Sequence, residues 1–322
     1  MNPLWRFVAV ASLFFWGASA HGNTYPEKPV RFIVAYPGGG SADLVARVIG
    51  QKLADNWQQA FVIDNRGGAG GVIGEELAAR SAPDGYTILL VSISHVVNPL
   101  LNAKLAYDPM KDLTPVSLLV SVPNVLVVHN AVGIKSVPEL IALAKAKPGQ
   151  LNYASSVGTS LHLAGELFKA MAGVDIVAVN FKGGGLAAAD LQTGRVQMSF
   201  AVFQTAQSLL KSGRLHALAI TSAKRSQLLP EVPTIAESLP GYELTGWLGI
   251  VAPAGTAPAI VNKLSSEIAA IIRTPETQSR LLGLGADPIG STPAQFTDFR
   301  KAEFSKVTKL MSRIKTKDEN KR

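Results

Sequence analysis

The sequence contains no cysteine among its 322 residues. This absence excludes a disulfide, a thiolate nucleophile, a cysteine-ligated metal and a cysteine-borne lipid anchor. Charged residues are scarce, at 17%, and aromatic residues make up only 7% of the chain. Stability must therefore come from a large apolar core. The length exceeds that of a usual single domain, which predicts two lobes.

Long hydrophobic runs are also lacking, except near the N-terminus. There, Arg6 precedes the apolar stretch Phe7–Trp16, and Ala18-Ser19-Ala20 fits an A-x-A cleavage site. We expect residues 1–20 to be a signal peptide that is cleaved after Ala20, so that the mature chain is exported. No later segment reaches the roughly 18 uncharged apolar residues that a transmembrane helix needs.

The net charge of +8 is concentrated at the C-terminus. Residues 300–322 contain nine Lys or Arg and three Asp or Glu, whereas the body of the chain is close to neutral. This distribution favours a solvated basic tail on a C-terminal helix; contact with an anionic membrane or a partner is the alternative. No zinc-finger, helix-turn-helix or RNP-type signature is present, so we expect no nucleic-acid partner.

Strand-like and helix-like segments alternate along the chain, which is typical of an α/β fold with mostly parallel sheets. Strands are predicted at Val30–Ala35, Phe61–Asp64, Thr87–Val91, Val116–Val120, Val125–His129, Leu151–Ala154, Ile176–Asn180, Val196–Val202, Leu215–Ile220 and Trp247–Val251. Helices are predicted at Asp43–Trp57, Gly71–Ser81, Val137–Lys147, Ser160–Met171, Leu186–Thr193, Thr205–Lys211, Ala259–Arg273, Glu276–Leu282 and Pro293–Lys315.

Two segments resemble crossovers between lobes. One is the short link Ser121–Asn124, and the other is the region after Arg225, which is dense in proline and glycine. The predicted organisation is residues 24–124 as the first part of lobe 1, 125–225 as lobe 2, and 226–322 as the second part of lobe 1. Two linking strands would form a hinge that permits closure over a ligand.

The segment Val30–Arg47, VRFIVAYPGGGSADLVAR, places three consecutive glycines between an apolar strand and a helix. Glycine backbone can take positive φ and approach a ligand, and Ser41 or Asp43 can cap the helix. A helix N-terminus carries a partial positive charge that stabilises a carboxylate or phosphate. A sharp turn without a ligand is the alternative. Neither the G-x-G-x-x-G nor the P-loop pattern is present.

Other loops that follow predicted strands are rich in glycine and small hydroxyl residues. In open α/β sheets the ligand crevice lies beyond the carboxyl ends of the strands. We therefore expect these loops to form a polar cleft for an anionic small molecule. They are Asn65–Gly71, Ser92–His95, Ser155–Thr159 and Phe181–Gly185.

Catalytic and metal-binding patterns are scarce. His162 and Glu166 stand four residues apart on a predicted helix, but no H-E-x-x-H motif or third ligand accompanies them, so no metal site is predicted. No G-x-S-x-G elbow occurs. His95 could either donate to a ligand from the rim of the cleft or cap the helix that follows it.

Several motifs in combination resemble the exported receptors of tripartite tricarboxylate transporters, the TctC or Bug proteins. They are YPEKPVRFIVAYPGGGSADLVAR, NRGGAGGVIG, YASSVGTSLHLAGELF, FKGGGLAAADLQTGRV and LHALAITSAKRSQLLPEVPTIAES. The resemblance implies a two-lobed Venus-flytrap fold of the type II periplasmic-binding kind, each lobe a mostly parallel sheet flanked by helices. It also implies a periplasmic, monomeric solute-binding protein that is not an enzyme and uses no cofactor.

The resemblance further implies a ligand and a binding site. The ligand is a small carboxylate, namely a di- or tricarboxylate, an acidic amino acid or an aromatic carboxylate. The partner is the membrane part of a tripartite tricarboxylate transporter or, alternatively, a sensor kinase. The residues implied to bind the ligand are Tyr36, Pro37, Gly38, Gly39, Gly40, Ser41, Asp43, Ser92, Ser94, His95, Ser155, Gly158, Thr159, Lys182, Gly183 and Gly184.

Three positions depart from the family pattern. Phe181 stands where tyrosine is common, Gly67 where proline is common, and Gln197 where aspartate often occurs. The missing phenolic hydroxyl at position 181 favours a more apolar or aromatic carboxylate. From another functional class, the alternative is an exported α/β enzyme acting on a nucleotide or phosphorylated substrate, because GAGGVIG forms a second glycine-rich turn.

Overall fold

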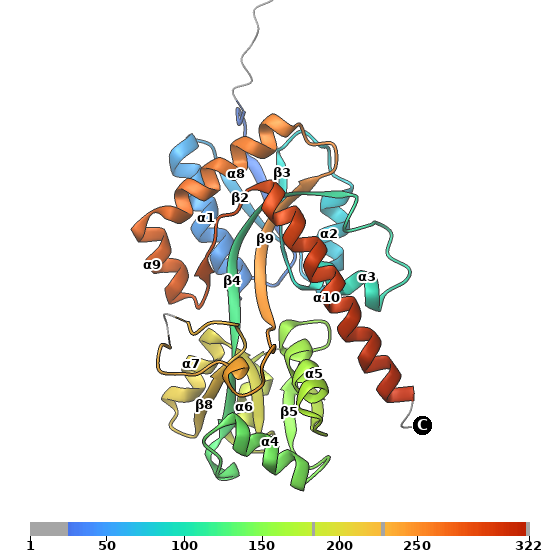
Figure 1. Cartoon of the computed structure of the whole chain (residues 1–322). Helices are drawn as coiled ribbons and strands as arrows, with labels where there is room; N and C mark the ends of the chain where they lie inside the picture. Colours follow the sequence, from blue (N-terminus) through green and yellow to red (C-terminus); the bar gives the residue numbers. More distant parts are fainter. Residues whose placement is uncertain (1–24, 182–183, 227–228, 320–322) are drawn as a thin grey trace, which may run out of the picture.

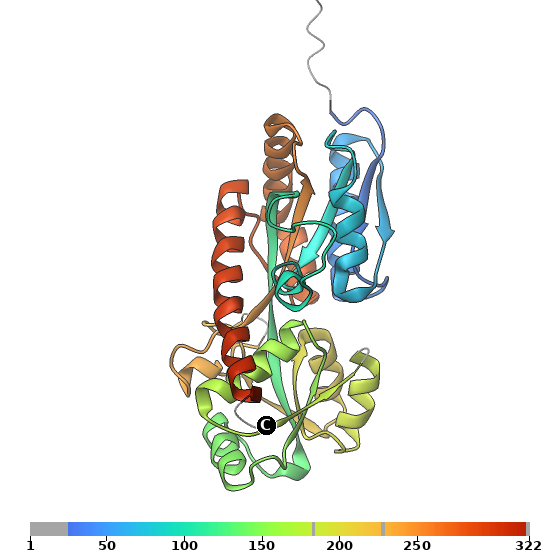
Figure 2. The same cartoon turned by 90° about the vertical axis from the view of Figure 1, so that its right-hand side faces the viewer.

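The computed structural model describes residues 25–181, 184–226 and 229–319. The predicted signal peptide lies outside these residues. Figure 1 shows two lobes joined along one long strand, and Figure 2 shows the same arrangement after a 90° turn. Within the described part of the chain, no helix combines the length and the apolar composition needed to cross a membrane.

The first lobe is built on a sheet with the strand order β2-β1-β3-β9-β4. Its strands β1 (Val30–Val34), β2 (Phe61–Asn65) and β3 (Thr87–Ser92) are parallel, whereas β9 (Thr245–Pro253) is antiparallel to both β3 and β4 (Leu113–His129). The short β10 (Asp287–Pro288) also pairs with β4. The helices of this lobe are α1 (Ser41–Trp57), α2 (Val72–Ala79), α3 (Ser94–Leu101), α8 (Pro258–Arg273), α9 (Pro275–Gly283) and α10 (Pro293–Glu319), with the 3-10 turn η1 (Ala69–Gly71) before α2.

The second lobe is built on a sheet with the order β4-β7-β5-β6, and β8 also pairs with β4. β5 (Asn152–Ser155) is parallel to β6 (Val177–Asn180) and to β7 (Met198–Val202), whereas β7 and β8 (Leu215–Ile220) are antiparallel to β4. The helical segments are α4 (Val137–Ala146), α5 (Ser160–Ala172), α6 (Gly184–Gln192) and α7 (Phe203–Lys211), with the 3-10 turns η2 (Asn130–Val132) and η3 (Ile235–Glu237).

Strand β4 belongs to both sheets. It pairs with β9 as far as Pro123 and with β7 from Asn124 onward. The prediction of two separate strands on either side of Ser121–Asn124 is therefore wrong, because these residues stay extended and paired in one strand of 17 residues. Pro123 is tolerated because it lies where the partner changes, so its missing N–H interrupts no continuous ladder.

The other predicted strands and helices are confirmed, with ends shifted by a few residues. The residues at the ends of these elements give clear sequence signals. Helix α4, for example, begins where the Ser136 hydroxyl accepts a hydrogen bond from the Glu139 N–H, with a proline in its first turn. Strand β10 was not predicted, and α3, the helix expected to follow His95, was predicted without bounds. Helix α3 contains Pro99 and has no side-chain cap, and β10 has only two residues.

The apolar core connects the two lobes. On one face of the first sheet, α1 and α8 cover Phe32 and Ile250. On the other face, a cluster beneath α2, α3 and α10 continues into the second lobe around Phe168. Helix α10 contacts α3 in the first lobe and α5 in the second, and Figures 1 and 2 show it extending from one lobe to the other. Its Phe296 ring lies edge-on to Trp247 of β9, 5.7 Å between centroids.

Candidate ligand-binding site

A cavity of about 840 Å³ lies between the two lobes. From the first lobe it is lined by the loop after β1, the first residues of α1, η1, and the junction of β3 with α3. From the second lobe it is lined by the start of α5, and the linking strands β4 and β9 form part of its wall. Its volume falls in the range of about 300–1,000 Å³ that is typical of small-molecule sites.

The glycine loop after β1 enters the cavity in a conformation that requires glycine. Gly39 has φ +82°, and the carboxylate of Asp43 accepts a hydrogen bond of 2.8 Å from its N–H. The N-cap of α1 is Gly40, which has no side chain, so the prediction that Ser41 or Asp43 caps this helix is wrong. No side-chain group therefore competes with a ligand at the N-cap position.

Asp43 stabilises the conformation of this loop through hydrogen bonds. Its side chain is 3% exposed and also accepts hydrogen bonds from the Arg47 guanidinium and the Asn65 amide. Burial alone would raise the pKa of this carboxyl, but the hydrogen bonds from Arg47, Gly39 and Asn65 together lower it below the ordinary value of 3.8. Asp43 is therefore ionised near neutral pH and holds the loop in place without lining the cavity.

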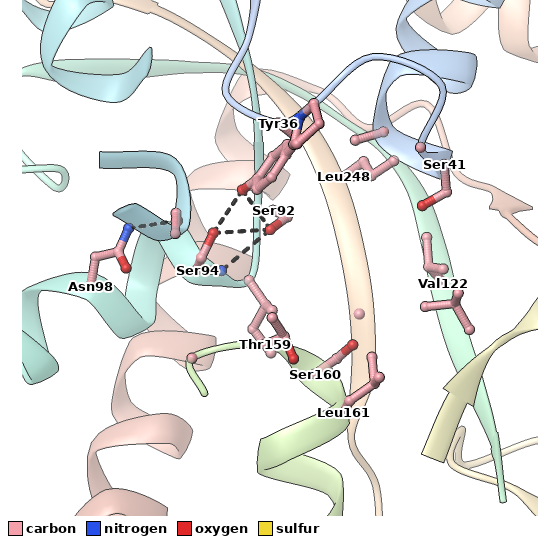
Figure 3. Close-up of a pocket in the computed structure, with 18 of the residues that line it drawn as sticks. Tyr36, Ser41, Ser92, Ser94, Asn98, Val122, Thr159, Ser160, Leu161 and Leu248 are labelled. Atoms are coloured by element: carbon pink, nitrogen blue, oxygen red, sulfur yellow. Dashed lines mark hydrogen bonds between the residues drawn. The ribbon is translucent and has the colours of Figure 1, made fainter. Parts of the chain in front are cut away.

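A cluster of three hydroxyl groups lies beside the glycine loop. The Tyr36 hydroxyl is 2.7 Å from the Oγ of Ser92 and 2.7 Å from the Oγ of Ser94, and the two Oγ atoms are 3.1 Å apart. Figure 3 shows the three side chains meeting at the cavity wall. Burial, with a smaller effect from Glu75, raises the pKa of Tyr36 to about 12, so its hydroxyl stays protonated.

The second lobe presents another helix N-terminus to the same cavity. Gly158 has φ +81°, and the N-cap Thr159 makes no side-chain cap because its hydroxyl donates to the Ser156 carbonyl at 2.6 Å. In Figure 3, Thr159, Ser160 and Leu161 lie across the cavity from the hydroxyl cluster. The N-termini of α1 and α5, from different lobes, thus face one space.

The cavity lining has little fixed charge. Among the described residues that line it there is no Asp, Glu, His, Lys or Arg. Positive potential comes instead from the N-termini of α1 and α5, each equivalent to roughly half an elementary charge. Such a lining can bind an anion through backbone N–H groups and hydroxyls, and none of its described residues carries a carboxylate, imidazole or amine. The described residues also include no group of three potential metal ligands.

Ten of the residues implied by the resemblance line the cavity. They are Tyr36, Pro37, Gly38, Gly39, Gly40, Ser41, Ser92, Ser94, Gly158 and Thr159. Asp43, His95 and Ser155 are not among the lining residues. Lys182 and Gly183 lie outside the described residues.

His95 fills neither of its predicted roles in this structure. Its ring is completely buried, with Nδ1 2.9 Å from Oε2 of Glu75 and Nε2 3.2 Å from Nη1 of Arg300. Because the Arg300 guanidinium can only donate, Nε2 accepts from it and Nδ1 donates to Glu75. Burial lowers the pKa of Arg300 to about 10, so the guanidinium stays charged near neutral pH. The three side chains connect α2, α3 and α10 directly behind Ser94.

Ser155, His162 and Glu166 are likewise surrounded by other residues of the second lobe. Ser155 is 2% exposed at the end of β5 and lines a smaller pocket in the second lobe. Glu166 accepts hydrogen bonds from the Tyr153 hydroxyl and from Lys169, each 2.8 Å long. Burial lowers the pKa of His162, which keeps its ring neutral near pH 7.

Sequence reasoning missed many of the lining residues, especially those on the linking strands. Asn98 carried a weak signal because it follows the serine-rich loop, and its amide donates to the Gly70 carbonyl. The apolar lining residues had no sequence signal of this kind. Ala69, Gly70, Ile93 and Val157 lie in loops that were predicted to form the cleft. The lining residues that were not predicted are Ala42, Val72, Asn98, Leu101, Asn102, Val122, Ser160, Leu161, Val202, Gly246, Trp247 and Leu248.

Comparisons with known proteins give a consistent result. The chain is 38% identical over 297 residues to the protein BugT of Bordetella pertussis, an alignment that covers 91% of this chain and 90% of BugT. The solved structure of Rpa4515 of R. palustris with adipate has a TM-score of 0.82 and 37% identity, covering 89% of this chain and 97% of that one. MatC of Rhodopseudomonas palustris with bound malate has a TM-score of 0.77 and 31% identity, covering 89% and 99%.

The fold and family implied by the sequence motifs are confirmed by these similarities. The family model described as the tripartite tricarboxylate transporter family receptor matches residues 45–316. This match covers most of both lobes and begins just after the glycine loop. The chain belongs to the TctC family of tripartite tricarboxylate transporter receptors.

Proposed function

We propose that this chain is a periplasmic solute-binding receptor that captures a small dicarboxylate between its lobes for the membrane part of a tripartite tricarboxylate transporter. The observation that supports this proposal is the pair of helix N-termini, from α1 and α5, facing one cavity in which none of the described lining residues is charged. A dicarboxylate has an anionic group for each of them.

The first carboxylate would bind at the glycine loop. Backbone N–H groups at the start of α1 and the hydroxyls of Tyr36, Ser92 and Ser94 lie on this side of the cavity. Hydrogen bonds to a charged group contribute about 1.5–3 kcal/mol each. A few such bonds and the two helix termini are sufficient for micromolar binding, which corresponds to about 8 kcal/mol.

The second carboxylate would bind at the start of α5, where Thr159 and Ser160 face the cavity. This division assigns one anionic group to each lobe, so the ligand stabilises the closed arrangement. The solved relatives support the ligand class, because one is described with adipate and the other with malate, and both molecules are dicarboxylates.

Export and the partner belong to the same proposal. We infer that residues 1–20 direct the chain to the periplasm and are removed after Ala20. Membership of the receptor family supports a membrane partner of the transporter type. The absence of acid–base side chains from the described cavity lining supports binding without turnover.

Isothermal titration of the exported chain tests the proposal. Adipate, malate and glutamate are titrated in parallel with NAD and ATP. We expect at least one dicarboxylate to bind with a micromolar or lower Kd and to stabilise the protein by about 2.7 kcal/mol at 100 times that Kd. Binding of a nucleotide without binding of any dicarboxylate would contradict the proposal and favour the enzyme alternative.

A further inference from the structure

The two lobes also touch outside the interlobe cavity, where the turn after α9 meets the start of α7. The side-chain amide of Gln204 on α7 donates to the Leu284 carbonyl, and the backbone of Gly285 packs closely against Phe203. None of these four residues lines the interlobe cavity. We call this contact, formed by Phe203, Gln204, Leu284 and Gly285, the outer contact.

The outer contact and the glycine loop lie on opposite sides of the strands that join the lobes. Val120 and Ser121 of β4 pair with β9 along one edge of the strand and with β10 along the other. The glycine loop follows β1, which lies beyond β9 and β3 in the same sheet. The outer contact lies on the β10 side, because β10 begins just after Gly285.

This placement determines what happens to the outer contact when the lobes close. The lobes are joined by β4 and β9, so closure is a rotation of the second lobe about these two strands. A rotation that moves the start of α5 toward the glycine loop moves the start of α7 away from the turn after α9. The interlobe cavity, about 840 Å³, is several times larger than the roughly 150 Å³ cavity that holds benzene. The lobes therefore have room to close further around a small dicarboxylate.

The outer contact is close but not fully satisfied. Gly285 has φ +70°, and a Cβ atom built on it would lie 2.2 Å from the Cβ atom of Phe203, well inside van der Waals contact. Oε1 of Gln204 is buried and has no hydrogen-bond partner among the described residues. A buried acceptor without a partner costs free energy, so a small change at this contact is sufficient to release it.

We propose that the outer contact opposes closure of the lobes and thereby sets the affinity of the interlobe site from outside it. The consequence for affinity rests on the proposed function. The apparent Kd is the intrinsic Kd divided by the fraction of the unliganded chain that is closed, so weakening the outer contact tightens binding. A neutral hydrogen bond that is lost on closure shifts this equilibrium by about two- to tenfold.

Two substitutions weaken the outer contact in different ways. Gly285→Ala adds a Cβ atom that overlaps Cβ of Phe203, which no rotamer change can relieve, and Gln204→Ala removes the hydrogen bond to Leu284. Each is expected to lower the Kd for adipate by about two- to tenfold in isothermal titration. The matched control is Gly255→Ala in the first lobe, with φ +88° and a nearest neighbouring atom 3.7 Å from the added Cβ, which should leave the Kd unchanged. Thermal unfolding shows whether each variant is folded.

The lobe arrangement can also be measured without a ligand. Because the chain has no cysteine, Gln51→Cys on α1 and Ala189→Cys on α6, both exposed, introduce the only two sites for nitroxide labels. Both helices lie on the cavity side of β4, because α1 starts in the cavity wall and α6 follows β6, beyond β5 in the second sheet. Double electron–electron resonance then measures the distance between the labels. We expect the population with the shorter distance to grow in Gly285→Ala and Gln204→Ala, but not in Gly255→Ala.

The outcomes separate the two proposals. An unchanged or longer label distance in the folded Gly285→Ala and Gln204→Ala variants would overturn the role of the outer contact, whether or not a dicarboxylate binds. A higher Kd for adipate in both variants would also overturn it. Failure of the unmodified chain to bind any dicarboxylate would overturn the proposed function instead, and the label distances would then decide on the outer contact alone.

Discussion

The substitution Asp43→Asn tests how the glycine loop is held in place. One carboxylate oxygen, Oδ2, accepts from the Gly39 N–H at 2.8 Å and from the Arg47 guanidinium at 2.9 Å. The other, Oδ1, accepts from the Asn65 amide at 3.0 Å. An asparagine has one acceptor oxygen, so its NH2 group must face at least one donor.

The magnitude follows from these contacts. A hydrogen bond to a buried charged group contributes about 1.5–3 kcal/mol, and the substitution removes at least one of the two that come from Gly39 and Asn65. Arg47 is 54% exposed, so its i,i+4 ion pair adds only about 0.3–0.5 kcal/mol. We expect a loss of about 2–3.5 kcal/mol in the free energy of unfolding, or roughly 3–6 °C in Tm for a chain of about 300 residues.

Thermal unfolding and titration with adipate measure the effect. Affinity for adipate should fall by about tenfold, because the loop loses the anchor of the Gly39 N–H that positions the start of α1. The matched control is Asp55→Asn on the same helix, where the carboxylate is exposed and accepts from Gln51. If the two variants have the same Tm, the bracing role assigned to Asp43 is wrong.

The dependence on pH provides a second check on Asp43. Its pKa in the folded protein is lower than the ordinary 3.8. The stabilisation is therefore complete above pH 3.8 and is lost as the pH falls through the lower folded-state pKa. The difference in Tm between the unmodified chain and Asp43→Asn should be constant from about pH 5 to 8 and should narrow only in strong acid.

Three further predictions concern neighbouring groups. Arg300→Met removes the guanidinium that donates to Nε2 of His95, whose Nδ1 contacts the buried Glu75, and should cost about 3–5 kcal/mol. Adding Glu75→Gln should recover part of this in urea unfolding, and strict additivity would contradict the coupling. Gly39 has φ +82°, so Gly39→Val should lower the free energy of unfolding by about 1–3 kcal/mol. Gly40 has φ −79°, so Gly40→Ala should lower it by less than about 0.5 kcal/mol. Equal Tm values for the two variants would refute the claim that position 39 requires glycine. Tyr36→Phe should weaken adipate binding about five- to tenfold in titrations; an unchanged Kd would place the carboxylate away from the hydroxyl cluster.

Features of the fold that depend on local sequence could be predicted. The three glycines after β1 form a loop that enters the cavity, as expected from the order of an apolar strand, glycines and a helix. The Ser-x-x-Glu pattern at Ser136 likewise starts α4. These signals involve neighbouring residues, so they do not depend on how the rest of the chain folds.

The remaining lining residues come together only through long-range pairing. Val122 and Gly246 are aligned across β4 and β9, and Val202 joins them from β7. None of these apolar residues differs in sequence from an ordinary core residue. The role of His95 was also hidden, because its partners Glu75 and Arg300 are 20 and 205 residues away along the chain.

The central claim is that neutral donors and helix N-termini hold a carboxylate in a cavity whose described lining has no charged side chain. Titration of the exported chain with adipate and with adipamide, its uncharged diamide, tests this claim most directly. We predict a micromolar or lower Kd for adipate and a Kd at least about 100-fold higher for adipamide, because only the dianion gains from the two helix termini and from charge-assisted hydrogen bonds. Equal affinities for the two compounds would contradict the account.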